Sequence, residues 1–343
     1  MRATVMYAAG DVRVEDRPDP VIEQPTDAVV RVVRSCVCGS DLHYFHKLER
    51  TESGRTTGHE FIGIVEAVGA AVTAVRPGDF VISPFAFADN TCALCREGVH
   101  TACPNGGFFA GAQAEYVRVP QADGTLVIAP GITESTDEAL LKSLLALSDV
   151  YLTGYHGAAM GRVGPGKIVT VIGDGAVGLS AVLAARQLGA EQIILMGRHT
   201  SRTDLGRDFG ATHVVAARGE EGIAEVRELT GGFGSHVLVE AVGHLSAYEQ
   251  CLGVIRPGGV ISRVGVPQYD DVNSGPGPLF GSNVTLTGGV APVRAYLEPA
   301  LAQVLAGTVE PGRVFDSVLP LEQAAQAYAD MDERRSIKVM LRP

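Results

Sequence analysis

One glycine-spaced segment constrains the fold of this chain more than any other feature. A β-branched run at 169–172 is followed by Gly173, Gly175 and Gly178, in the pattern G-x-G-x-x-G, and residues 177–188 then have the pattern of a helix. Between a strand and a helix, Gly173 permits a tight turn. Gly175 lets a pyrophosphate approach the backbone, and Gly178 lets the helix pack closely on the strand.

The motif therefore predicts a dinucleotide site. The helix that follows would present unpaired N–H groups, those of Ala176 and Val177 among them, to the phosphates of the ligand. A purely structural glycine turn is the alternative, but the strand–turn–helix context favours the binding site.

The region around this motif alternates between strands and helices. This alternation implies right-handed crossovers and a parallel sheet that is covered on both faces. The expected strands are 167–172, 192–196, 214–215, 236–239 and 260–264, and the expected helices are 177–188 and 201–209.

The first 130 residues have a different pattern. Short β-branched segments at 28–33, 62–68 and 80–82 predict strands separated by turns, and helical patterning is scarce. Near the end of the chain, 295–306 and 322–330 are expected to be helical, and 337–341 is expected to form a strand. A compact β domain and a separate α/β domain follow from this contrast.

Charge and hydropathy exclude several classes of function. Acidic residues outnumber basic ones, 39 to 28, and the formal net charge of −11 argues against a nucleic-acid partner. No apolar run approaches the roughly 18–20 residues needed to span a bilayer, so no membrane association is expected. Arg2, Arg13, Glu15 and Asp16 interrupt the N-terminal apolar residues, unlike a secretory signal, and the expected location is the cytoplasm.

The six cysteines are unevenly placed, which favours metal binding over cross-linking in a reducing compartment. Cys36 and Cys251 are expected to be small buried apolar residues. Cys38 is followed at a distance by His59. A thiolate and an imidazole, with a third ligand and one open position, form the pattern of a catalytic zinc site.

The segment around His59 carries a specific resemblance. Gly58-His59-Glu60-x2-Gly63-x5-Gly69-x2-Val72 reads without a gap as the zinc signature of the medium-chain dehydrogenases. The chain resembles a zinc-dependent medium-chain alcohol dehydrogenase over essentially its whole length. The resemblance implies an α/β fold, with a GroES-like β-rich catalytic zinc domain at 1–150 and 291–343. A Rossmann domain with a doubly wound parallel sheet would occupy 151–290.

The resemblance also implies a catalytic zinc site with Cys38 and His59 as ligands. The segment 149–158 resembles the secondary-alcohol branch of the family, so Asp149 is the expected third ligand. Glu60 would sit beside the metal, where it could exchange with water as a ligand. Asp41 resembles the carboxylate that orients the ligating histidine.

A second zinc site is expected at Asp89, Cys92, Cys95 and Cys103. The family's structural zinc lobe has four cysteines with this spacing, and this chain departs from it at Asp89. A carboxylate can bind zinc, although a thiolate is usual in a closed site. The alternative is an eroded lobe with free thiols.

The resemblance implies reversible hydride transfer between an alcohol carbon and a nicotinamide. Zinc as a Lewis acid lowers the pKa of a bound alcohol, Ser40 would take the hydroxyl proton, and His43 could relay it to solvent. Five further positions carry over from the family. Phe85 would line the substrate pocket; Val264, Gly265 and Val266 would contact the nicotinamide; and Lys338 would reach the cofactor phosphates.

The end of the second strand of the α/β domain bears on the choice of cofactor. NAD-specific relatives place an acidic residue there for the ribose 2′-hydroxyl, and this chain has Gly197. Arg198, with His199 and Arg202, could bind a 2′-phosphate, so NADP(H) is expected to be preferred over NAD(H). Solvated surface arginines are the alternative, and Asp204 in the same segment could oppose a phosphate.

Several functions stay open within this fold. The leading expectation is an oxidoreductase acting on a small or medium alcohol, aldehyde or ketone as a homodimer or homotetramer. A polyol or amino-alcohol (threonine-type) dehydrogenase is the nearest alternative. A zinc-free quinone or enone reductase is disfavoured because such relatives generally lack the Cys38, His59 and Asp149 set. From another class, a non-enzymatic NADPH-binding sensor would bind cofactor without turnover.

Overall fold

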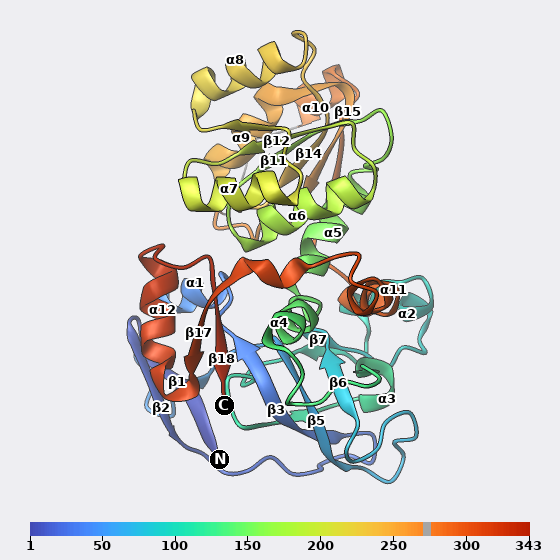
Figure 1. Ribbon diagram of the computed structural model, residues 1–343, viewed down its shortest axis with the longest axis vertical. Helices are drawn as coiled ribbons and strands as arrows, with labels where there is room; N and C mark the ends of the chain where they lie inside the picture. Colours follow the sequence, from blue (N-terminus) through green and yellow to red (C-terminus); the bar gives the residue numbers. More distant parts are fainter. Residues whose placement is uncertain (270–275) are drawn as a thin grey trace. The chain divides into compact units, whose positions relative to one another are not determined.

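The computed structural model describes residues 1–269 and 276–343, and its contacts divide the chain into two compact units (Figure 1). Unit 1 consists of Met1–Asp149 and Pro292–Pro343, and unit 2 is the continuous segment Val150–Ala291. Each unit has its own principal sheet. Among the described residues, no helix combines the length and the apolar character needed to cross a membrane.

Unit 2 is built on a six-stranded sheet in the order β13-β12-β11-β14-β15-β16, in which every neighbouring pair is parallel. The strands are β11 (Ile168–Ile172), β12 (Gln192–Met196), β13 (His213–Val215), β14 (Ser235–Glu240), β15 (Ile255–Arg263) and β16 (Thr285–Gly288). The direction of winding reverses between β11 and β14. Doubly wound sheets bind ligands at the carboxyl ends of the strands that flank such a reversal.

Helices cover both faces of this sheet, as the alternating pattern predicts. They are α5 (Val150–Met160), α6 (Ala176–Gln187), α7 (Thr200–Phe209), α8 (Gly219–Leu229), α9 (Leu245–Val254) and α10 (Pro276–Gly281). Helices α6 and α7 lie side by side, as do α8 and α9. One core contains strand residues such as Ile194, Leu238 and Ile261 with Val226 of α8 and Tyr248 of α9. The alternate residues of the same strands face the opposite side.

Helix α5 was not predicted from the sequence, nor were α4 (Glu138–Ala146), α8 and α9. In α5 the reason is physical. It contains Gly154 and Gly157, which lower helix propensity, and its buried residues lie around most of the helix, so no amphipathic period shows. A Cβ at Gly154 would lie 2.5 Å from the backbone nitrogen of Ala181 in α6. The glycine is therefore needed for the two helices to pack closely.

Unit 1 is mainly antiparallel. Its largest sheet runs β10-β6-β5-β3-β18-β17, with β9 also paired to β3, and only β17 and β18 are parallel. These strands are β3 (Ala28–Cys36), β5 (Phe61–Val68), β6 (Phe80–Ser83), β9 (Tyr116–Val119), β10 (Val127–Ile128), β17 (Phe315–Pro320) and β18 (Lys338–Arg342). Two small sheets contain β1 (Arg2–Ala8), β2 (Asp11–Asp16) and β4 (Arg55–Thr56), and β7 (Ala86–Phe87) with β8 (Gly107–Phe108).

The helices of unit 1 are short or peripheral. They are α1 (Asp41–Lys47), α2 (Ala93–Arg96), α3 (Ala122–Thr125), α4, α11 (Val293–Leu305) and α12 (Ala324–Asp332), with 3-10 turns at His100–Ala102, Pro311–Val314 and Leu321–Gln323. Helices α11 and α12 begin and end within two residues of the predicted ranges.

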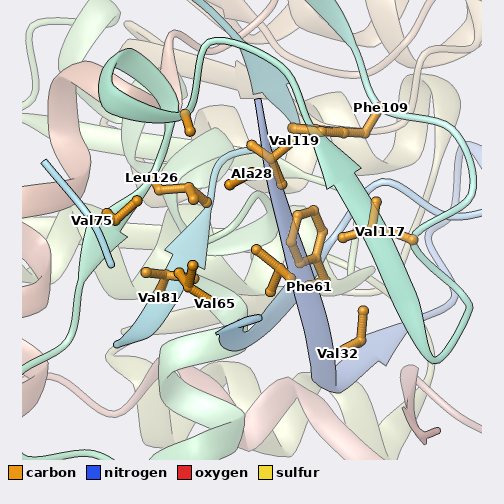
Figure 2. Close-up of a cluster of buried hydrophobic side chains, with 13 residues drawn as sticks. Ala28, Val32, Phe61, Val65, Val75, Val81, Phe109, Val117, Val119 and Leu126 are labelled. Atoms are coloured by element: carbon orange, nitrogen blue, oxygen red, sulfur yellow. The ribbon is translucent and has the colours of Figure 1, made fainter. Parts of the chain in front are cut away.

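The principal core of unit 1 lies on one face of β3 and β5 (Figure 2). Ala28, Val30 and Val32 project to the same side of β3 because side chains alternate along a strand. They pack with the fully buried Phe61, whose ring meets that of Phe109 edge-on at a centroid distance of 5.4 Å. This core fixes β3 against β5, so that the end of β3 at Cys36 lies beside the start of β5 at Phe61.

Candidate active site

A thiol, an imidazole and two carboxylates converge at one end of β3 and β5. The potential ligand atoms of Cys38, His59, Glu60 and Asp149 all lie within 4.8 Å of one another. Cys38 follows the end of β3, and His59 and Glu60 precede the start of β5. The two strands are antiparallel with Ser35 opposite Phe61, so the exit from one and the entry to the other are adjacent.

Asp149 reaches the cluster from a different segment, three residues beyond the end of α4. Phe85 fixes this segment through its backbone, because its N–H donates to the carbonyl of Ser148 at 3.0 Å. Gly58 sets the approach of His59: its φ is +88°, and a Cβ there would lie 2.5 Å from Gln113 Cγ. A side chain at position 58 would therefore be both strained and blocked.

The ring of His59 is surrounded by anionic groups. Its Nε2 lies 3.4 Å from Asp149 Oδ2 and 3.9 Å from Glu60 Oε1, and its Nδ1 lies 3.7 Å from Asp41 Oδ1. Burial alone would lower the pKa of this imidazole, but the nearby Cys38, Asp149 and Asp41 raise the pKa of His59 well above its ordinary value. The site is thus electrostatically suited to a cation.

Asp41, which was expected to orient His59, is held by two donors. The backbone N–H of Cys38 donates to its Oδ2 at 2.9 Å, and the Gln113 side-chain amide donates to the same oxygen at 3.2 Å. Gln113 is completely buried and also accepts bonds from Thr57 at 2.7 Å and from Tyr328 at 3.1 Å. No motif marks Gln113 in the sequence, and only its contacts identify it.

Glu60 is fully buried, and its Oε1 accepts a hydrogen bond from Lys338 Nζ at 2.7 Å. Among the described residues, its other oxygen, Oε2, is buried without a hydrogen-bond donor. Burial raises the pKa of Glu60, and Lys338 opposes that shift. A buried carboxylate oxygen without a donor, beside a thiol and an imidazole, fits a site that holds a metal ion.

Lys338 is buried next to Glu60 and is not a solvated edge lysine. It was expected to reach the cofactor phosphates, with a solvated edge lysine as the alternative. The structure instead buries it to 1% exposure, where Nζ donates to Glu60 and to the Val37 carbonyl. The cause is the pairing of β18 with β3, Met340 opposite Cys36, which brings Lys338 at the start of β18 close to Glu60. Figure 1 shows the two strands side by side.

Helix α1 carries the two residues expected to move a proton. Ser40 is the N-cap residue of α1, but its hydroxyl makes no hydrogen bond to the backbone N–H groups at the start of this helix. His43 lies in the first turn of the same helix and is half-buried.

Two aromatic rings stand beside the cluster. Phe85 is 9% exposed, and its ring meets His59 edge-on at a centroid distance of 6.2 Å. Phe108 stacks on Phe85 at a centroid distance of 6.0 Å and is 59% exposed. Phe108 was not predicted from the sequence, and no pattern links it to Phe85.

The second predicted metal group also comes together. The potential ligand atoms of Asp89, Cys92, Cys95 and Cys103 lie within 4.8 Å of one another, and all six cysteines of the chain are free thiols. Asp89 accepts hydrogen bonds from the backbone N–H groups of Thr91 and Cys92. These bonds hold the pKa of Asp89 well below its ordinary value, so it is a carboxylate at neutral pH. Burial raises the pKa of the Cys95 thiol to about 12.

The glycine motif of unit 2 has the geometry of a phosphate-binding turn. Gly173 has a φ of +117°, and a Cβ at Gly178 would lie 1.9 Å from the Gly173 carbonyl oxygen. Gly175 differs, because a Cβ there would meet nothing within 4 Å. Packing does not require a glycine at this position, so the open space fits the close approach of a pyrophosphate. Helix α6 begins at Ala176 and Val177, and no side chain caps it. The backbone N–H groups of its first turn are therefore left for an anionic ligand.

The end of β15 leads to the residues expected at the nicotinamide. Val264 is buried, and the backbone N–H groups of Val264 and Gly265 donate to the Glu240 carbonyl. Val266 is 53% exposed. These residues follow the carboxyl end of β15, next to that of β14.

A carboxylate from the glycine motif is bonded to the expected ribose-binding segment. Arg198 is exposed, and Asp204 pairs with Arg207 at 2.7 Å. The side chain of Asp174, from within the glycine motif, accepts hydrogen bonds from the backbone N–H groups of Arg198 and His199. Arg202 lies half-buried in the first turn of α7.

Comparison with known proteins identifies both parts of the chain. Residues 24–130 match the model of the alcohol dehydrogenase GroES-like domain, and residues 176–306 match that of the zinc-binding dehydrogenases. Together these matches cover more than half of the chain.

Individual relatives agree with these models. The chain is 34% identical to zinc-type alcohol dehydrogenase B of Aspergillus flavus, over all of this chain and 81% of that protein. It is 31% identical to sorbitol dehydrogenase of Bacillus subtilis, over 79% of this chain and 77% of that protein. Among solved structures, alcohol dehydrogenase TADH from Thermus sp. ATN1 is 33% identical, with a TM-score of 0.92 and complete coverage of both chains.

Replacing Lys338 by Met should lower the free energy of unfolding by about 3–5 kcal/mol, because the buried carboxylate of Glu60 would lose the ammonium that bonds it at 2.7 Å. Urea unfolding of the two proteins checks this. Lys47→Met, at an exposed lysine, should be close to neutral. The double variant Glu60→Gln/Lys338→Met should regain most of the loss. A neutral Lys338→Met would contradict the buried pair.

Proposed function

The chain belongs to the zinc-dependent medium-chain alcohol dehydrogenases, which are NAD(P)-dependent oxidoreductases, and from this we propose that it transfers a hydride reversibly between a small or medium-sized alcohol, of the secondary class, and NADP(H). The observation that carries the proposal is the convergence of Cys38, His59, Glu60 and Asp149 in a chain that also has a complete dinucleotide motif.

Cys38, His59 and Asp149 would be the three protein ligands of a catalytic zinc. Three ligands leave one position open for the substrate oxygen, and Glu60 stands within ligand distance of the same place. A zinc ion there would supply Lewis acidity toward the alcohol oxygen, and the nicotinamide would accept or return the hydride. Asp41, whose Oδ1 lies 3.7 Å from His59 Nδ1, would orient the ring so that Nε2 faces the cluster.

Ser40 and His43 would move the proton. The Ser40 hydroxyl is not used as a helix cap, so it can accept the substrate proton and donate its own. His43 would pass the proton to solvent, since imidazole titrates near neutral pH. Phe85, with Phe108 stacked on it, would form an apolar wall of the substrate pocket beside His59.

Unit 2 would hold the cofactor. The open space at Gly175 and the uncapped start of α6 support pyrophosphate binding there. Val264, Gly265 and Val266 would contact the nicotinamide. Arg198, His199 and Arg202 would favour the 2′-phosphate of NADP(H), since guanidinium groups bind phosphate in bidentate fashion.

A polyol dehydrogenase is the second candidate, and the relative named sorbitol dehydrogenase supports it. A panel of secondary alcohols, polyols and amino alcohols, followed by cofactor absorbance, separates the two. The highest kcat/KM on polyols would replace the first proposal with the second. Absence of turnover across the panel, with cofactor still bound, would favour a sensor instead. Light scattering of the purified protein tests the expected homodimer or homotetramer.

Asp149→Ala should remove most of the catalytic zinc and nearly all turnover, because one of three protein ligands is lost. Metal analysis and kcat on the best substrate measure both effects. Asp16→Ala, at an exposed aspartate, serves as the matched control. Full zinc content and normal rates in Asp149→Ala would show that Asp149 is not a ligand.

A second zinc, bound by Asp89, Cys92, Cys95 and Cys103, should bring the metal content to about two ions per chain. Its role would be structural, since four protein ligands leave no open position. Asp89→Cys should keep both ions, and Asp89→Ala should lose the second. One ion per chain, with titratable thiols in the lobe, would mean that the site is vacant.

Arg198→Ala should lower kcat/KM for NADP(H) by about 10- to 100-fold, because a charge-assisted contact with the 2′-phosphate is lost. The value of kcat/KM for NAD(H) should stay almost unchanged, since NAD(H) has no 2′-phosphate. The measurement is kcat/KM for both cofactors at one saturating substrate. Equal values for the two cofactors in the unmodified protein, or a preference for NAD(H), would indicate that Arg198 faces solvent.

A further inference from the structure

Asp174 links the two loops that would flank the adenosine half of the cofactor. It occupies the variable position between Gly173 and Gly175, at the carboxyl end of β11. Its Oδ2 accepts hydrogen bonds from the backbone N–H groups of Arg198 at 2.9 Å and His199 at 3.0 Å, and lies 2.8 Å from His199 Nδ1. The side chain thus crosses from the end of β11 to the end of β12.

The same side chain explains the glycine at the end of β12. A Cβ at Gly197 would lie 2.5 Å from Asp174 Cβ and 2.9 Å from Asp174 Oδ2. The space that a side chain at position 197 would fill is therefore already taken. Gly197 is required by Asp174, so the absence of an acidic residue there does not by itself indicate room for a 2′-phosphate.

The carboxylate of Asp174 nevertheless lies next to position 197, at the end of β12. In dinucleotide folds, the acidic residue at the end of the second strand accepts the ribose 2′-hydroxyl. Here the carboxylate comes from the first strand–helix turn and occupies the volume next to position 197. We propose that Asp174 is a cofactor-specificity residue, which accepts a hydrogen bond from the ribose 2′-hydroxyl of NAD(H) and opposes the 2′-phosphate of NADP(H).

The charge and the bonding of Asp174 fit this role. The three close nitrogen contacts all involve Oδ2, and within the described part of the chain no hydrogen bond reaches Oδ1. Burial would raise the pKa of this carboxyl group, but the bonds from His199 and Arg198 outweigh burial and lower it. Asp174 is consequently anionic at neutral pH and retains an acceptor oxygen.

Charges of opposite sign would then determine the relative affinities for NADP(H) and NAD(H). Arg198 and Arg202 would attract a 2′-phosphate, whereas the buried carboxylate of Asp174, only 7% exposed, would repel it. The inference rests on the proposed cofactor site. If Asp174 has this role, the ratio of the affinity for NADP(H) to that for NAD(H) is lower than Arg198 and Arg202 alone would produce.

The test compares two adenosine fragments on the full-length, zinc-loaded protein. Adenosine 5′-monophosphate carries a free 2′-hydroxyl, and adenosine 2′,5′-bisphosphate carries a 2′-phosphate. Asp174→Asn keeps the shape and one acceptor oxygen for the Arg198 and His199 N–H groups, but it removes the charge. Isothermal titration calorimetry should show the bisphosphate binding about tenfold more tightly to the variant, and the monophosphate binding unchanged or a few-fold more weakly.

Asp204→Asn is the matched control, because it removes a negative charge from the same segment at a residue that pairs with Arg207. It should leave the affinity ratio of the two fragments unchanged. An unchanged ratio in Asp174→Asn, or an equal loss of affinity for both fragments, would overturn the proposal and reduce Asp174 to a structural link between loops. If the unmodified protein bound neither fragment, the proposed cofactor site itself would fail, which is a different result.

Discussion

The antiparallel ladder between β3 and β5 is the constraint from which the metal cluster follows. A core packed on one face of these strands holds them in a single register, and a one-residue slip would turn Phe61 out of that core. The register places the exit of β3 opposite the entry of β5. Cys38 and His59 are distant in sequence, yet they meet because each lies just beyond the paired part of its strand.

The electrostatics of the cluster follow from the same geometry. A thiol and three carboxylates gather around one imidazole, and the ammonium of Lys338 lies below them, bonded to only one of the carboxylates. So many acidic groups in a half-buried place are tolerable only if positive charge is supplied. The carboxylate next to the ring is itself held in place, because Gln113 donates to one oxygen of Asp41 while the other lies 3.7 Å from His59 Nδ1.

Local patterns were sufficient to predict much of the molecule. Glycine spacing predicted the turn after β11, and β-branched runs predicted most strands of both sheets. Cysteine spacing predicted the metal group at 89–103, whereas the group around His59 was predicted from the resemblance of that segment to a zinc signature. The features that could not be predicted depend on long-range contacts. Gln113 acts through partners far along the chain. The position of Lys338 depends on a strand pairing across almost the whole sequence. Asp174 occupies a variable position of its motif, so only its contact with Gly197 shows that it matters.

The interrupted sequence of unit 1 has a consequence for folding during synthesis. Unit 2 is continuous, so all of its strands are available once residue 291 has left the ribosome. Unit 1 must wait, because β17 and β18 complete its largest sheet and are made last. Until β18 pairs with β3, the first 149 residues present an unpaired edge, and Glu60 has no ammonium beside it. The growing chain therefore passes through a stage in which one unit is complete while the other is open to aggregation or to chaperones.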